Sequence, residues 1–152
     1  MKLFSGPVEL LDAVGESLGS SQWHLLTQDL VDRFAANTGD RQWIHIDPVR
    51  AAAGPFRGTI AHGYLVLAMI PALMNEAFQV SGVSIVLNKE LRKLRFLAPV
   101  PVGARVRAAV RLVAVRRRPR GYWEADLSAI VQIEGLGTPA VTAEFVFLYQ
   151  QS

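Results

Sequence analysis

The feature that most constrains the fold is a long apolar segment that is followed by a change in hydrophobic period. Residues 63–79, GYLVLAMIPALMNEAFQ, carry apolar side chains on nearly every side of a helical wheel. This pattern is typical of a helix that is buried on most of its surface. Pro71 removes one helical hydrogen bond, so we expect a kink near residues 67–71. The segment predicts a helix at the centre of the fold.

Four segments after Gly82 alternate apolar and polar residues with the period of two that marks β-strands. They span residues 84–97, 104–117, 121–133 and 139–149, with short turns between them. Short turns join antiparallel neighbours. Helices first and strands second indicate an α+β fold, in which a long antiparallel sheet wraps around the central helix. A chain of 152 residues fits one domain, residues 1–152.

The first half of the chain contains several start and stop signals for short elements. Residues 7–15 predict a short helix and residues 22–26 a short strand. Thr27 is expected to cap a helix that ends at Gly39. Asp47 and Pro48 are expected to begin a second, shorter helix. The stretch between them, which begins D-R-Q-W-I-H at residue 40, is therefore expected to be a loop.

The composition excludes several kinds of site. The chain has no cysteine, which rules out disulfides, thiolate metal ligands and a cysteine nucleophile. The longest apolar run, residues 64–73, is shorter than the about 18 residues of a membrane span, and the N-terminus lacks a signal-like apolar run. We expect a cytoplasmic protein with no membrane association and no metal site.

Positive charge is concentrated in one part of the chain. Residues 89–120 hold eleven of the sixteen Lys and Arg residues, including Arg116, Arg117, Arg118 and Arg120. These cations could contact the phosphates of a nucleotide-like ligand such as coenzyme A, or they could solvate an outer sheet face. The net charge is only +3, and no recognition helix or aromatic platform accompanies it, so nucleic acid binding is not expected.

Asp40 and His45 form the strongest candidate site in the sequence. A carboxylate and an imidazole in one short segment can both reach one water molecule and offer acid and base capacity near neutral pH. Taken alone, the pair also fits a surface aspartate and a histidine that bonds to the backbone. Gly63 begins the predicted central helix, where free N–H groups and the helix dipole can hold a developing oxyanion. The preceding His62 fits a helix cap or a loop anchor.

These stretches resemble a known family. F-A-A-N-T-G-D-R-Q-W-I-H-I-D-P, then G-P-F-R-G-T-I-A-H-G-Y-L and K-L-R-F-L-A-P-V-P-V-G, are similar to the motifs of the MaoC-like, R-specific enoyl-CoA hydratases of the hotdog-fold superfamily. The similarity is greatest to a sub-branch that includes nodulation-protein-N-like proteins. It covers residues 27–148 and implies a hotdog fold, a homodimer and hydration of trans-2-enoyl-CoA to (R)-3-hydroxyacyl-CoA.

The resemblance also implies roles for particular residues. Asp40 and His45 match the catalytic pair, and Gly63 matches the residue whose N–H holds the thioester oxygen. The implied reaction needs no cofactor, because coenzyme A is part of the substrate. Gln42 and Trp43 replace the Asn-Pro that is usual in the family. Gln42 can supply the same amide chemistry, and Trp43 could either line the acyl site or support the loop. The candidate substrate-binding residues are Gln42, Trp43, His62 and Tyr64.

Two other functions remain open at this point. A hotdog thioesterase typically needs a carboxylate on the central helix, where Glu76 is the only acid. An acyl-CoA-binding protein without activity would retain the fold and lose turnover, although the intact Asp40 and His45 argue against it.

Pro71 stands where several relatives carry a small polar residue. His24, far from the motif, is expected to be structural.

Overall fold

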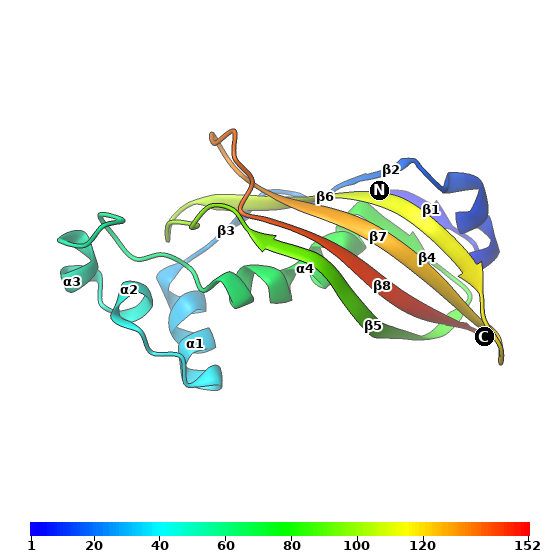
Figure 1. Ribbon diagram of the computed structural model, residues 1–152, viewed down its shortest axis with the longest axis horizontal. Coiled ribbons are helices and arrows are strands. Elements are labelled where there is room, and N and C mark those ends of the chain that lie inside the picture. Colours follow the sequence, from blue (N-terminus) through cyan, green and yellow to red (C-terminus); the bar gives the residue numbers. More distant parts are fainter.

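The computed structural model describes residues 1–152. It has one large sheet, one small two-stranded sheet and one long helix, with shorter helices at both ends of the large sheet (Figure 1). The elements are β1 (Lys2–Phe4), the 3₁₀-helix η1 (Pro7–Ala13), β2 (Ser17–Ser20), β3 (His24–Leu25), α1 (Gln28–Thr38), α2 (Trp43–Ile46), α3 (Pro48–Ala52), α4 (Gly63–Ala77), β4 (Phe78–Val80), β5 (Val83–Phe96), β6 (Arg105–Arg117), β7 (Tyr122–Ile133) and β8 (Val141–Gln151).

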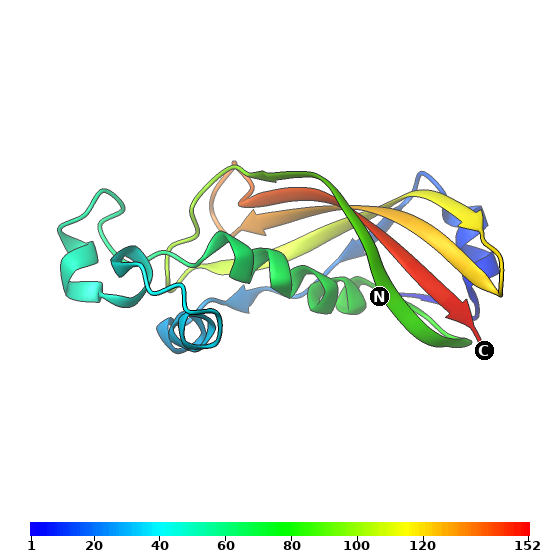
Figure 2. The ribbon, with the colours of Figure 1, turned by 60° about the horizontal axis from the view of Figure 1, so that its bottom comes forward.

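The large sheet is antiparallel throughout. Its strands lie in the order β2-β6-β7-β8-β5, and β3 pairs with the beginning of β6. β1 and β4 form a separate parallel pair. Figure 2 shows the sheet curving along α4, with α1, α2 and α3 beyond one end of it. The predicted α+β arrangement, an antiparallel sheet around a central helix, is confirmed.

The core lies between α4 and the concave face of the sheet. Leu65, Val66, Ile70, Leu73, Met74 and Ala77 are the buried residues of α4. The helix contacts β6, β7 and β8, whose inward residues include the fully buried Leu112 and Leu127. The other side of α4 is open to solvent in the single chain, at Tyr64, Ala68, Ala72 and Asn75. No helix of the structure is both long enough and apolar enough to cross a bilayer.

Capping residues begin or end α1 and α3 where the sequence predicts. The Thr27 hydroxyl accepts the N–H of Leu30 at 3.2 Å, and Gly39 ends α1 in the left-handed region at φ 81°. The Asp47 carboxylate accepts the N–H of Arg50 at 2.9 Å and caps α3. Gly39 and Asp47 therefore bound the short segment that carries Asp40 and His45.

Three local predictions are wrong in their boundaries or type. His45 lies in a turn of α-helix, α2, and not in a loop, since the Asp47 N–H reaches the Trp43 carbonyl at 3.1 Å. The central helix ends at Ala77, because the next three residues pair with β1 as β4. Only His24 and Leu25 of residues 22–26 form a strand. One turn, or a strand of two or three residues, is too short to show periodicity.

Packing of α4 against the sheet should dominate stability. Ile70 is fully buried at the middle of the helix. We expect Ile70→Ala to lower the free energy of unfolding by about 2–5 kcal/mol, because a core cavity replaces the lost contacts. Val49→Ala is the matched control, since Val49 is 86% exposed. It should change the free energy of unfolding by less than about 0.5 kcal/mol. Urea denaturation measures both, and equal effects would contradict this account of the core.

Candidate active site

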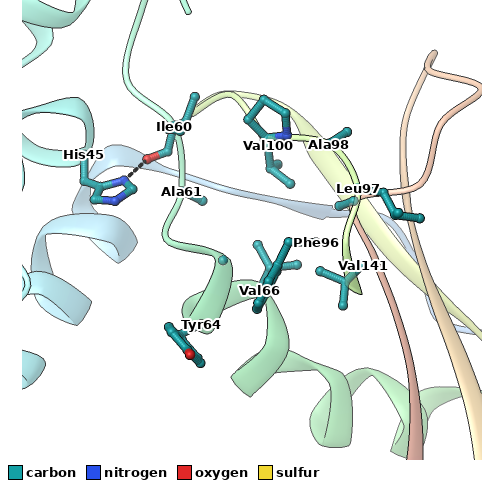
Figure 3. A pocket seen from close by; sticks show the side chains of 13 residues that line it. His45, Ile60, Ala61, Tyr64, Val66, Phe96, Leu97, Ala98, Val100 and Val141 are labelled. Atoms are coloured by element: carbon teal, nitrogen blue, oxygen red, sulfur yellow. Dashed lines mark hydrogen bonds between the residues drawn. The ribbon is translucent and has the colours of Figure 1, made fainter. Parts of the chain in front are cut away.

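His45 is a buried histidine whose orientation is fixed by one hydrogen bond. It is 7% exposed, and its Nδ1 lies 2.7 Å from the carbonyl oxygen of Ile60 (Figure 3). A carbonyl oxygen only accepts, so Nδ1 carries the proton and donates. The Nε2 of the neutral ring is left with its lone pair. This is the form that a general base requires.

Burial keeps this histidine in its neutral form near pH 7. Loss of hydration lowers the pKa of His45 below its ordinary 6.5, and the nearby His62 lowers it further. The Ile60 hydrogen bond and Asp40 raise the pKa but do not reverse the direction. His45 can therefore accept a proton under physiological conditions.

The structure brings Asp40 to His45. Asp40 directly follows the Gly39 stop of α1 and is exposed. One potential ligand atom from each of Asp40, His45 and His62 lies within 4.8 Å of the other two. A single water molecule can therefore contact both the carboxylate of Asp40 and the ring of His45.

His62 occupies the N-cap position of α4 without using its side chain as a cap. Its Nε2–H donates to the backbone carbonyl of Asp40 at 2.9 Å, and its ring stacks on that of His45 at a centroid distance of 3.8 Å. The anchor interpretation of His62 is confirmed, and the capping one is wrong. His62 is 2% exposed and does not line the cavity described below, so the structure gives no support to its predicted contact with substrate.

The cluster of Asp40, His45 and His62 offers the donor types of a metal site, but the ring geometry does not favour one. The two imidazole planes differ by only 25° and lie face to face. Their lone pairs, which lie in the ring planes, therefore run nearly side by side and do not converge on one ion at the roughly 2.0–2.1 Å of a zinc–nitrogen bond. The arrangement suits a shared water better than a shared metal.

A largely apolar cavity of about 390 Å³ opens beside His45. Gly63 and Tyr64, at the start of α4, both line it, and Figure 3 shows Tyr64 beside the first turn of this helix. Ala61, Val66, Leu97 and Val141 are among the ten hydrophobic residues of its thirteen-residue lining. Because the first N–H groups of a helix have no partner within it, the Gly63 end of α4 can donate to an oxygen in this cavity.

Phe96 is a site residue that the sequence analysis missed. Its ring lines the cavity and packs edge-on against Tyr64, with centroids 5.7 Å apart. A Cβ added to Gly63 would lie 2.9 Å from the Phe96 ring carbons. A larger residue at position 63 would therefore require the Phe96 ring to move. Phe96 stands in the quoted K-L-R-F motif, which is the only signal that could have identified it.

Gln28 and Thr59 are further supporting residues that were missed. The Gln28 amide donates to the His45 carbonyl at 2.7 Å and accepts the Thr59 hydroxyl at 2.6 Å. These bonds connect α1, α2 and the segment before α4. A lone glutamine at a helix start carries no pattern that would reveal partners this far along the chain.

Comparison with known proteins identifies the family. The profile of the MaoC like domain matches residues 9–132. The chain belongs to the MaoC-like family. 3-Hydroxyacyl-thioester dehydratase Z of Mycobacterium tuberculosis is 48% identical over 149 residues, which cover 98% of this chain and 99% of that protein. Nodulation protein N of Rhizobium leguminosarum is 36% identical, over 90% of this chain and 86% of that protein.

A solved MaoC-like structure has the same fold. The (R)-hydratase from A. caviae involved in PHA biosynthesis superimposes with a TM-score of 0.71 and 29% identity, over 88% of this chain and 94% of that one. The resemblance to the hydratase family, and to its nodulation-protein-N-like members, is confirmed. These relatives place the chain among hotdog-fold hydratases and dehydratases.

The two residues that depart from the MaoC-like motif lie outside the cavity. Gln42 is exposed at the N-cap of α2. Trp43 packs against Gly54, and the guanidinium of Arg50 lies 4.5 Å above its ring. Neither residue lines the cavity. Trp43 therefore supports the α2–α3 turn, and of the four candidate substrate-binding residues only Tyr64 lines the cavity.

Glu76 and Pro71 lie elsewhere on α4. Glu76 is 2.8 Å from His24 Nε2, and it accepts the backbone N–H of Gln22 at 3.0 Å. These contacts lower the pKa of Glu76 and agree with a structural role for His24. Pro71 lines a different cavity, near β4, and α4 continues through it. No acid of the central helix faces the cavity beside His45.

Two buried carboxylates form ion pairs with several of the cations on the outer face of the sheet. Glu124 and Asp126, at 1% and 5% exposure, project from β7. Arg116 contacts both carboxylates at 3.2 Å or less, and Arg118 contacts Glu124 at 2.8 Å. The structure favours the outer-face interpretation for these two arginines over a contact with coenzyme A.

The Glu124 contacts predict a pH-dependent contribution to stability. The hydrogen bond from Arg118 and the ion pair with Lys89 outweigh burial and lower the pKa of Glu124 to about 2. Because the folded pKa is below the unfolded one, this stabilisation is fully present above about pH 4.5 and is lost as the pH falls through about 2. We expect Glu124→Gln to lower the free energy of unfolding at pH 7. The difference from wild type should become smaller as the solution is acidified.

Chemical denaturation of both proteins between pH 7 and pH 3 measures this difference. Glu134→Gln is the matched control, because Glu134 is 46% exposed and faces Arg105 at 3.5 Å, so its loss should have little effect at any pH. A Glu124→Gln deficit that stays constant with pH would show that the carboxylate charge is not what stabilises the network.

Proposed function

We propose that the chain catalyses the reversible hydration of trans-2-enoyl-CoA to (R)-3-hydroxyacyl-CoA. One observation carries the proposal: His45, whose Nε2 is left free by the Nδ1 bond to Ile60, lines an apolar cavity at the start of α4, and one of its ring nitrogens lies within 4.8 Å of a carboxylate oxygen of Asp40. The cavity suits an acyl chain, and the helix start suits a thioester oxygen. The names of the dehydratase and (R)-hydratase relatives support the same reaction class.

In the proposed mechanism, one water molecule is held by Asp40 and His45. His45 Nε2 takes a proton from the water as its oxygen attacks the β-carbon, while the Gly63 N–H stabilises the enolate-like thioester oxygen. Asp40 orients the water and passes the proton that His45 has taken from it to the α-carbon, on the same face as the new hydroxyl. A hydroxyl is added to the β-carbon and a hydrogen to the α-carbon, so no redox cofactor is required. Coenzyme A enters as part of the substrate.

The alternative functions receive less support from the site. A thioesterase would use a carboxylate of the central helix, and Glu76 is already bound to His24 and the Gln22 backbone. An inactive acyl-CoA-binding protein would have no need of a buried histidine with a free Nε2 beside a carboxylate. Release of free CoA thiol from a saturated acyl-CoA would favour the thioesterase over the hydratase.

The catalytic assignment predicts the effect of two substitutions. The wild-type protein should bleach the enoyl-thioester absorbance of a short or medium trans-2-enoyl-CoA. We expect Asp40→Asn and His45→Ala each to lower kcat by about 10²–10⁴-fold, because each removes one partner in proton transfer. Stopped-flow absorbance at saturating substrate measures the rates.

Glu76→Gln serves as the control, since it alters an acid on the central helix that lies outside the cavity. It should keep nearly the full hydration rate. If neither Asp40→Asn nor His45→Ala lowers the rate, the site assignment is wrong. If wild-type protein binds enoyl-CoA in calorimetry without turnover, the binding-protein alternative is favoured.

The homodimer implied by the family remains part of the proposal. β5 is the terminal strand of the large sheet, and Ile85, Val86, Leu87 and Leu91 on it are each 41–49% exposed. A long edge strand with exposed apolar side chains requires cover to avoid aggregation. The open side of α4 adds a second uncovered surface. A second copy of the chain along β5 would cover this edge.

A charge placed on β5 tests the proposed dimer. We expect sedimentation velocity to give the mass of two chains for the wild type and a shift toward one chain for Leu87→Lys, because burying an unpaired ammonium group is unfavourable. Leu136→Lys is the matched control, since Leu136 is 54% exposed in the β7–β8 turn. A wild-type monomer, or a Leu87→Lys dimer as stable as the wild type, would contradict the assignment of this edge.

A further inference from the structure

His62 contacts both residues of the proposed catalytic pair. One face of its ring stacks on His45, with centroids 3.8 Å apart and planes 25° apart. Phe34 of α1 lies 5.0 Å away in a tilted arrangement. The Nε2–H donates to the Asp40 backbone carbonyl at 2.9 Å. His62 is thus wedged between α1, α2 and the segment that carries Asp40.

The polar atoms of His62 argue against a simple packing role. Since the Asp40 carbonyl can only accept, Nε2 carries the hydrogen of this bond, and Nδ1 is the ring nitrogen that it leaves over. That Nδ1 is buried and has no hydrogen-bond partner in the protein. A buried polar atom without a partner is unfavourable for stability. Phenylalanine would fill a similar space without this cost, so the hydrogen bond from Nε2 is the feature that requires histidine.

Asp40 has few other constraints. Its side chain is exposed, and its backbone N–H makes only a long 3.4 Å contact with the Thr38 hydroxyl. His45, by comparison, is already held by Ile60 and by the Gln28 amide on its carbonyl. The bond from His62 is therefore the contact that ties the Asp40 backbone to the buried part of the site.

We propose that His62 is a positioning residue that fixes the backbone of Asp40 relative to the ring of His45, so that the side chains of both residues contact the same water. The proposal rests on the proposed hydratase function and deepens it. His62 acts through Asp40 and His45 and does not itself touch the substrate. Its removal should therefore lower kcat and leave KM nearly unchanged. Misplacement of a reacting group by about 1 Å can cost about 10²-fold in rate.

Two substitutions separate positioning from packing. His62→Phe keeps an aromatic ring against His45 and loses the donor. His62→Gln loses the ring but can present an amide N–H at the distance of Nε2. If the hydrogen bond matters, we expect His62→Phe to lower kcat by about 10–100-fold, and His62→Gln to recover most of the rate. If only packing matters, the order of the two variants should reverse.

The pH dependence of kcat/KM gives an independent readout. The titratable groups that act on His45 are His62, which lowers its pKa, and Asp40, which raises it. Without His62 the pKa of His45 should rise. Because His45 must be neutral to act as a base, the acidic limb of the profile should move to higher pH in both variants.

Hydrogen exchange provides a test that does not depend on activity. In mass spectrometry of the peptide covering residues 39–46, His62→Phe should exchange faster than wild type, while His62→Gln should stay close to it. Thermal unfolding of all three proteins identifies any variant that simply fails to fold.

The outcomes distinguish the two proposals. Unchanged exchange in His62→Phe, or a His62→Phe rate equal to or above that of His62→Gln, would overturn the role of His62. A wild type that hydrates no enoyl-thioester would overturn the proposed function, while the exchange comparison would still decide whether His62 holds Asp40.

Discussion

The site depends on one hydrogen bond, from His45 Nδ1 to the carbonyl of Ile60 at 2.7 Å. This bond joins the single turn α2 to the segment that leads into α4. It sets the ring tautomer, directs the free Nε2 lone pair, and fixes His45 beside the start of the helix. A one-turn helix has almost no stability of its own, so α2 depends on contacts of this kind. Gln28 adds a second such contact through the His45 carbonyl.

The fold was predictable from the sequence because its signals are long. The apolar segment from Gly63 and the four alternating strand segments each span ten residues or more, and periodicity is reliable at that length. The short elements were not predictable in the same way. β1, β2 and β4 contain three or four residues each, and their pairing depends on tertiary contacts. The turn that places His45 on α2 was missed for the same reason.

The candidate site could be predicted only in part. Asp40, His45 and Gly63 were identifiable because they stand in short motifs with chemically meaningful spacing. The structure adds Phe96, whose ring approaches Gly63, and Gln28, which bonds across 17 and 31 residues of sequence. Such partners are set by the fold and leave no local pattern. Trp43 shows the opposite case, since its place in the motif allowed either substrate contact or support of the loop, and its ring packs on Gly54.

The central claim is that Asp40 and His45 act on one water on one side of the bound enoyl-thioester. Hydration of trans-2-butenoyl-CoA in D₂O, followed by chiral and NMR analysis of the product, tests this most directly. The account predicts only the (R)-3-hydroxyacyl-CoA, with deuterium on the α-carbon added to the same face as the hydroxyl. A racemic or (S) product, or addition to opposite faces, would contradict it.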